Sequence, residues 1–189
     1  MDKATLLNHL KVIQSVYATG LTLWGLLCTL DEQTIKRNRI ILKEDGIDIV
    51  PPGRTLYIPP NMGIYNVQLG GPLQWNIGHA SLEFSKMLLR NFTNDSFEIV
   101  HNYCEESDQL DKLRSQLWYH FARLVRNALT HNQRWLLSRP SDLRILPVTW
   151  HGKVIEATMN GNEMTFEFYD WFDGMELWEE MYVFGESLY

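Results

Sequence analysis

Three residues near the middle of the chain combine types and spacing that suit acid–base chemistry on a phosphate group. Arg126, Asn127 and His131 follow one another as Arg-Asn-x-x-x-His. A histidine titrates near neutral pH and can act as a general base or acid. An arginine stays cationic and can stabilise negative charge that develops on phosphate oxygens. This spacing occurs by chance in many helices, so the surrounding sequence must decide what these residues do.

A long amphipathic helix is predicted to carry these residues. Apolar side chains recur at steps of three and four, at Leu110, Leu113, Leu117, Phe121, Leu124 and Ala128. Ser107 and Asp108 precede this run as a predicted N-cap, and Asp108 and Asp111 suit the helix dipole. A simpler interpretation is that Arg126 is a surface arginine and that His131 caps the helix, where the dipole also favours a histidine.

Helix geometry restricts how the three residues could act together. Positions five apart lie about 140° apart around an α-helix, so Arg126 and His131 of one chain are poorly placed to hold one phosphate. Asn127 and His131 are four apart and share a face. If two copies of the helix met across a twofold axis, Arg126 of one chain would lie near His131 of the other.

The rest of the sequence predicts a mainly helical protein with a small β unit. Helical spacing predicts helices over residues 4–30, 77–88, 97–103 and 170–184, with a polar joint at 91–96. After Arg139-Pro140 the pattern changes, and residues 145–168 predict a small antiparallel unit with glycine turns. The aromatic residues near the C-terminus are predicted to pack in the core or in an interface.

Residues 31–72 are predicted to form an irregular insertion in a single domain of residues 1–189. The runs 40–43 and 47–50 flank Glu44-Asp45-Gly46, which is typical of a β-hairpin. Repeated prolines and glycines then exclude a long helix. The insertion could cap the mouth of a site or extend a contact between two chains.

The charges are segregated along the chain. The 189 residues carry a net charge of −6, which by itself argues against a general nucleic-acid coat protein. Residues 112–144 nevertheless carry +6, with seven basic residues against Asp142, and residues 154–189 carry −9 with no lysine or arginine. Arginines suit phosphate binding because of their planar fork. They could instead pair with the acidic tail in an internal network.

Composition places the chain among ordinary globular proteins. Apolar residues make up 45% and charged residues 21%, which excludes wholesale disorder. Cys28 and Cys104 are too few for a disulfide framework, so we expect a reduced, cytoplasmic protein. The N-terminus has no predicted signal peptide. Residues 12–30 lack charge, but polar residues and glycines interrupt them, so a buried helix is expected and not a membrane span.

The run around Arg126, Asn127 and His131 resembles the signature of the HEPN superfamily (higher eukaryotes and prokaryotes nucleotide-binding domains). In that family an arginine, a polar neighbour and a histidine four to six positions later form the active site. Its members are small helical bundles that pair as homodimers, and many are metal-independent RNA endonucleases of toxin–antitoxin, abortive-infection and CRISPR defence systems. The likeness covers about a dozen residues and the order of helices, and residues 31–72 have no counterpart in it.

The resemblance implies a mechanism and a set of partners. RNA carries its own nucleophile, the 2′-hydroxyl, so cleavage needs proton transfer by His131 and charge stabilisation by Arg126. Asn127 would orient a phosphate oxygen or the imidazole. Arg123 and Arg134 are predicted to bind the RNA backbone. The implied partners are a second copy of the chain, RNA, and an antitoxin or nucleotidyltransferase.

Other kinds of site find less support in the sequence. The six histidines show no ligand spacing for a metal, and no nucleotide-binding glycine motif or nucleophile elbow occurs, so no cofactor or metal is expected. His120 lies three residues before Arg123 and could reach a cleft between two paired chains, although an exposed or partly packed helix residue is the simpler interpretation. The alternatives to a ribonuclease are a non-catalytic HEPN-like dimer that binds nucleotides or protein, and an interaction protein that uses its acidic C-terminus.

Overall fold

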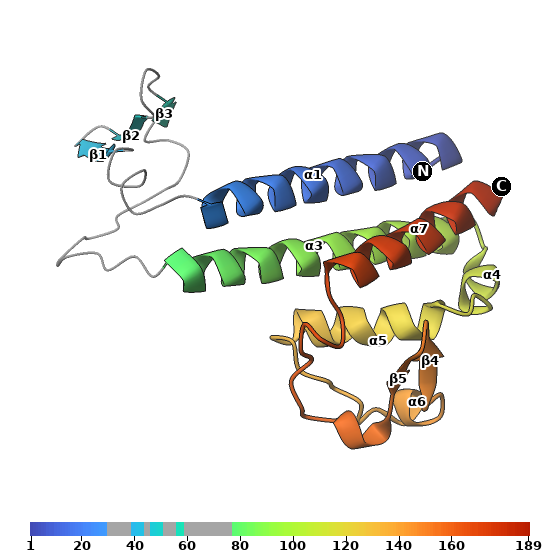
Figure 1. Cartoon of the computed structure of the whole chain (residues 1–189). Helices are drawn as coiled ribbons and strands as arrows, with labels where there is room; N and C mark the ends of the chain where they lie inside the picture. Colours follow the sequence, from blue (N-terminus) through green and yellow to red (C-terminus); the bar gives the residue numbers. More distant parts are fainter. Residues whose placement is uncertain (30–38, 44–45, 51–55, 59–76) are drawn as a thin grey trace. The chain divides into compact units, whose positions relative to one another are not determined.

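The computed structural model describes residues 1–29, 39–43, 46–50, 56–58 and 77–189. The chain divides into two compact units, one formed by Met1–Leu21 with Phe84–Tyr189 and the other by Thr22–Glu83. Figure 1 shows the elements of both, and each unit is considered by itself. Helices dominate the described part of the chain, as the sequence predicts.

The smaller unit contains an antiparallel sheet. Its strands β1 (Arg39–Lys43), β2 (Gly46–Val50) and β3 (Leu56–Ile58) lie in the order β1-β2-β3. Ile40 pairs with Ile49, and Asp48 pairs with Tyr57. The predicted hairpin is therefore confirmed. The insertion is more regular than expected, because Leu56–Ile58 adds a third strand. The proline- and glycine-rich runs at 51–55 and 59–72 lie outside the described residues.

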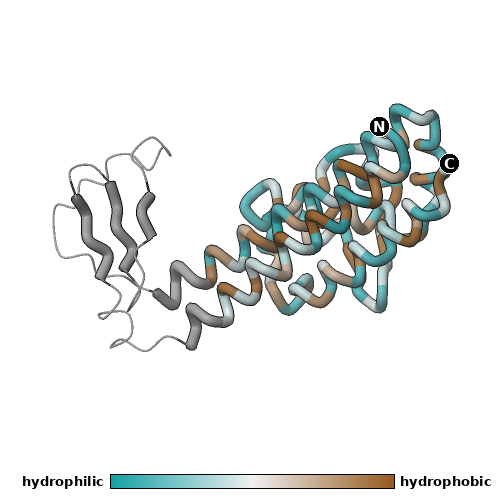
Figure 2. The backbone as a smooth tube through the Cα atoms, turned by 90° about the horizontal axis from the view of Figure 1, so that it is seen from above, coloured by the Kyte–Doolittle hydropathy of each residue, from teal (hydrophilic) through white to brown (hydrophobic). Residues whose placement is uncertain are grey.

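The larger unit contains residues 3–21 of helix α1 (Lys3–Thr29), residues 84–106 of α3 (Ile77–Glu106) and the whole of α7 (Trp171–Ser187). Hydrophobic residues recur along them among hydrophilic ones (Figure 2). Tyr17 of α1 stacks on Phe92 of α3 with ring centroids 4.0 Å apart. Trp178 of α7 donates from Nε1 to the carbonyl oxygen of Leu10, at 3.1 Å. No helix in the described part of the chain has the length and apolarity needed to cross a membrane.

The predicted polar joint at 91–96 is wrong, because α3 continues through it. Thr93 and Ser96 in this run are buried. The Thr93 hydroxyl hydrogen-bonds the Tyr169 hydroxyl at 3.0 Å. A polar group is tolerated inside a helix when tertiary structure gives it a partner, and that partner lies 76 residues away.

The predicted continuous helix from Leu110 to Ala128 is also wrong. It is divided into α4 (Leu110–Arg114) and α5 (Tyr119–Thr130). Leu117, which the apolar spacing placed in the core, is 94% exposed, whereas Trp118 is buried. Trp118 packs edge-to-face against Phe184, with centroids 5.8 Å apart. Burying the larger side chain favours this break over a continuous helix.

The predicted N-cap of this helix is displaced as well. Asp108 adopts a left-handed conformation with φ +56°, and Gln109 precedes α4 without a capping side-chain hydrogen bond. The Ser107 hydroxyl instead donates to the carbonyl oxygen of Tyr103, at 2.7 Å. Ser107 therefore belongs to the end of α3.

The C-terminal third contains α6 (Pro140–Leu143), the strands β4 (Val148–Trp150) and β5 (Lys153–Ile155), and the short helix η2 (Ala157–Met159). The antiparallel β4–β5 pair confirms the predicted hairpin. His151 and Gly152 form its turn with φ of +45° and +79°, as a tight primed turn requires. The predicted antiparallel unit ends earlier than expected, since residues 164–168 form no strand and residues 166–168 form a turn.

The closing helix agrees with its prediction. Asp170 accepts hydrogen bonds from the backbone N–H groups of Phe172 and Asp173, and the Asp173 carboxylate accepts from the Asp170 N–H. This reciprocal capping box fixes the start of α7. Trp178 and Phe184 are buried as expected, whereas Phe172 is exposed.

The buried Thr93–Tyr169 hydrogen bond yields a prediction about stability. Tyr169→Phe leaves the Thr93 hydroxyl without its partner, and we expect the free energy of unfolding to fall by about 1–2 kcal/mol. Thr93→Val should cost a similar amount, while the double variant should be little worse than either single one. Urea unfolding followed by circular dichroism measures all three. Fully additive losses would contradict this account.

Candidate active site at the end of α5

One face of α5 packs in the core, which leaves its polar residues at the surface. Phe121, Leu124, Val125 and Ala128 are among its buried residues. The opposite side carries Arg123, Arg126 and Asn127, which are half-buried. Because Arg123, Asn127 and His131 are spaced four apart, they follow one stripe of the helix.

Two polar contacts join α3 to α5 beside this stripe. The Glu98 carboxylate forms an ion pair with Nη2 of Arg126. One helical turn earlier on α3, Nδ2 of Asn94 donates to the Thr130 hydroxyl at 3.3 Å. Asn94 thus meets the residue that is later on α5, so the two helices run antiparallel here. The Thr130 hydroxyl also donates to the carbonyl oxygen of Arg126, at 2.9 Å.

These contacts hold the Arg126 guanidinium in place. Its Nη1 donates to Oδ1 of Asn127 at 3.1 Å, in addition to the pair with Glu98. The side chain is 33% exposed. Burial lowers the pKa of Arg126, yet an arginine remains cationic at neutral pH. Arg126 is therefore an oriented cation at the surface.

The backbone of His131 forms the end of α5, and its side chain is exposed to solvent. Its N–H donates to the carbonyl oxygens of Asn127 and Ala128, both at 3.1 Å. The next two residues, Asn132 and Gln133, have positive φ and turn the chain. Within the described residues, no hydrogen bond joins the imidazole to Arg126 or Asn127. The structure thus brings Arg126 and Asn127 together, while His131 stands apart.

The two predicted RNA-binding arginines have different surroundings. Nη2 of Arg123 pairs with Oδ1 of Asp142 at 2.7 Å, and Asp142 is fully buried. Arg123 therefore anchors α6 to α5. Burial and the nearby charge of Arg123 lower the pKa of His120, which favours its neutral form. Arg134 is exposed and donates from Nη1 to the carbonyl oxygen of Gly161, at 3.1 Å.

The sequence alone did not indicate that three residues contact the predicted site, namely Glu98, Asn94 and Asp142. Glu98 and Asn94 come from a run that was predicted to be a joint and a separate short helix. Their spacing of four residues would have indicated a shared helix face. Nothing in the sequence indicates that this face meets Arg126, which lies 28 residues after Glu98.

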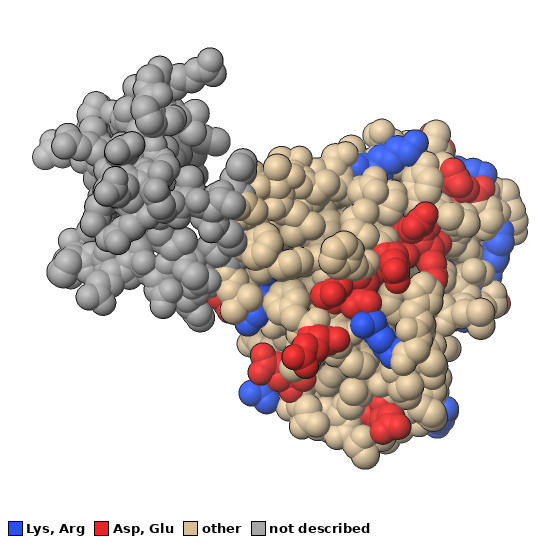
Figure 3. All heavy atoms as spheres, viewed as in Figure 1, with Lys and Arg blue, Asp and Glu red and all other residues tan. Residues whose placement is uncertain are grey.

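The acidic tail does not neutralise the arginines in the part of the chain that the structure describes. Figure 3 shows acidic side chains gathered across the face that carries α7. Glu176 and Glu180 pair with the two ring nitrogens of His151, each at 3.0 Å. Lys153 pairs with Asp173 at 3.1 Å. The alternative of an arginine–tail network is therefore not observed there.

Comparisons with known proteins found no match. Neither the family models, nor the curated proteins, nor the solved structures that were compared gave a match to this chain. Among the described residues, no group of histidine, cysteine and acidic side chains is arranged to hold a metal ion.

The Arg123–Asp142 pair yields a prediction that tests whether Arg123 has a structural role. Arg123→Ala would leave the Asp142 carboxylate buried without its cation, and we expect a loss of about 3 kcal/mol in the free energy of unfolding. The matched control is Arg114→Ala, which breaks the exposed pair with Asp111 and should cost less than about 1 kcal/mol. Chemical denaturation measures both variants. Equal losses would show that the Arg123 pair has no special role.

The His151 cluster yields a prediction about pH. A hydrogen bond to Glu176 and the charges of Glu180 and Glu176 raise the pKa of His151. A raised pKa means that this interaction stabilises the fold fully below the unfolded pKa and is lost as pH rises through the folded value. NMR titration of the His151 ring should give a pKa above about 6.5. Glu176→Gln should lower that pKa, whereas the control Glu163→Gln should leave it unchanged.

Proposed function

We propose that this protein is a metal-independent endoribonuclease of the HEPN type. One observation carries the proposal: Glu98 and Asn127 fix the cationic Arg126 at the surface, five positions before an exposed histidine that ends the same helix. A held guanidinium can bind a phosphate without first losing side-chain freedom. A role in a toxin–antitoxin or phage-defence system follows from the resemblance of the motif alone.

The chemistry uses a nucleophile that belongs to the substrate. The 2′-oxygen of RNA attacks the adjacent phosphorus while the His131 imidazole takes its proton, and the bond from phosphorus to the 5′-oxygen breaks. The same imidazole then gives that proton to the departing 5′-oxygen. Arg126 stabilises the additional negative charge on the phosphorane. The products are a 2′,3′-cyclic phosphate and a 5′-hydroxyl.

Glu98 does not prevent Arg126 from acting in this way. A guanidinium has five N–H donors, and each terminal nitrogen carries two of them. One donor of Nη1 goes to Asn127 and one of Nη2 goes to Glu98. Each terminal nitrogen therefore keeps a second N–H that can face a phosphate oxygen. Glu98 orients the guanidinium and lowers the net charge of the site.

The separation of His131 from Arg126 favours a site that two chains build together. The imidazole makes no hydrogen bond to Arg126 in the described part of this chain. A twofold pair of α5 ends would supply Arg126 from one chain and His131 from the other. Arg134, which follows the turn after His131, would then contact the RNA backbone near the cleft.

The Glu98–Arg126 ion pair also favours a second candidate. A guanidinium that is already neutralised by a carboxylate could serve as a structural element in a non-catalytic dimer that binds nucleotides or protein. Such a module would tolerate loss of the imidazole. A cleavage assay with variants therefore distinguishes the two functions.

The composite site makes a quantitative prediction for mixed subunits. In the presence of EDTA, Arg126→Ala and His131→Ala should each abolish cleavage of single-stranded RNA, because each removes one half of both sites. When the two variants are unfolded together and refolded in equal amounts, half of the dimers are mixed and hold one intact site, so about a quarter of the activity should return. Gel analysis of end-labelled RNA measures this.

Two controls make the result interpretable. His9→Ala changes an exposed histidine on α1 and should leave cleavage unchanged. Arg126→Lys keeps the charge but loses the planar fork, so it should retain little activity. Absence of cleavage by the wild type, or cleavage indifferent to both alanine variants, would overturn the ribonuclease proposal. Inactive single variants that recover no activity on mixing would overturn the composite site.

A further inference from the structure

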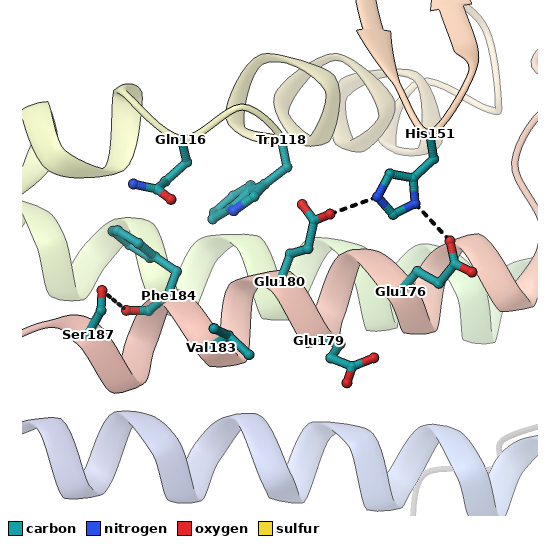
Figure 4. Close-up of a pocket in the computed structure, with 9 residues that line it drawn as sticks. All are labelled: Gln116, Trp118, His151, Glu176, Glu179, Glu180, Val183, Phe184 and Ser187. Carbon is teal, nitrogen blue, oxygen red and sulfur yellow. Dashed lines mark hydrogen bonds and ion pairs between the residues drawn. The ribbon is translucent and has the colours of Figure 1, made fainter.

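A groove of about 680 Å³ lies between α7 and the segment that links α4 to α5 (Figure 4). Gln116 and Trp118 line one side of it, and α7 lines the other. His151, at the turn of the β4–β5 hairpin, reaches over the helix at one end. Each of these residues belongs to the larger unit. The groove uses no residue of the candidate active site.

The groove is apolar toward one end. Phe184 of α7 faces Trp118 there, and Val183 of the same helix also lines the groove. Phe184 and Trp118 are buried against each other, but Val183 is 58% exposed. Leu117, next to Trp118, is exposed almost completely. Exposed apolar side chains beside a groove are typical of a surface that a partner protein covers.

The other end of the groove is acidic. Glu176, Glu179 and Glu180 line it. Residues 154–189 contain no lysine or arginine, so no neighbour on α7 balances these charges. His151 pairs with Glu176 and Glu180, and Trp150 donates from Nε1 to Glu180 at 3.3 Å.

The cations near the groove are engaged elsewhere. Lys153 pairs with Asp173. Lys112, at the opposite end, donates to the carbonyl oxygen of Ser187 at 2.6 Å. Glu179 has no cationic partner within the described residues. The acidic end therefore keeps a net negative charge, even when His151 is protonated.

We propose that this groove binds a basic amphipathic helix of a partner protein. Lysines or arginines at one end of that helix would face Glu176, Glu179 and Glu180, and its apolar residues would pack on the exposed Val183, beside the buried Phe184 and Trp118. Glu176 and Val183 are seven positions apart, about 10 Å along α7, which matches two turns of a bound helix. Complementary charge and an apolar strip together define this occupant.

A synthetic peptide tests the groove directly. The probe is a fluorescent helical peptide of about 18 residues with lysines toward one end of one face and leucines toward the other. A peptide with glutamates in place of the lysines is the control ligand. Fluorescence anisotropy with the full chain at about 150 mM salt measures binding, since this salt screens weak surface attraction.

Matched variants locate the binding site. The triple variant Glu176→Gln, Glu179→Gln and Glu180→Gln should weaken binding by about tenfold, because it removes the acidic end and keeps side-chain size. The control Glu156→Gln, Glu163→Gln and Glu167→Gln removes equal charge from exposed positions outside the groove and should change binding less than about twofold. Val183→Ser leaves the charge unchanged and should weaken binding about fivefold.

Several outcomes would overturn the proposal. Equal losses in both triple variants would show unspecific attraction to an acidic protein. Binding that Val183→Ser does not weaken would show that the peptide makes no apolar contact with the groove. This variant still tests the proposal if the groove triple variant fails to fold. Self-association that the groove triple abolishes in analytical ultracentrifugation would assign the groove to a second copy. Tight binding of the glutamate peptide would contradict the charge argument. None of these results depends on RNA cleavage.

Discussion

The antiparallel contact between α3 and α5 orients Arg126, on which the chemistry proposed for the end of α5 depends. Glu98 meets Arg126 and Asn94 meets Thr130, so two successive turns of α3 hold the last turns of α5. Without this contact, Arg126 would be a long, mobile side chain at the surface. With it, the guanidinium has a fixed direction beside Asn127.

The charged residues are arranged in different ways at α5 and at α7. At α5, arginines are matched one by one with acids from other elements, as Arg123 with Asp142 and Arg126 with Glu98. At α7, the acids face outward and gather along one face, where His151 partly balances them. The net charge of −6 conceals both patterns. We infer that the first surface serves phosphate chemistry and that the second serves recognition of a basic partner.

Much of the fold could be predicted from local patterns. The extent of α1, the hairpins at β1–β2 and β4–β5, and the helix α7 were all predicted from apolar spacing and turn residues. The errors occurred where contacts between residues distant in the sequence decided the local structure. Thr93 remains helical because Tyr169 satisfies its hydroxyl. Leu117 is exposed because Trp118 gains more from burial, which spacing alone could not show.

The sequence by itself determined which groups are available at the candidate site. It supplies an arginine, an asparagine and a histidine at the end of a helix, and helix periodicity already separates Arg126 from His131. Only the tertiary structure decided that Glu98 and Asn127 orient Arg126 and that Asp142 pairs with Arg123. It also decided that the acidic tail borders a groove. The reason is physical: spacing fixes neighbours within one helix, whereas contacts between helices depend on packing across many residues.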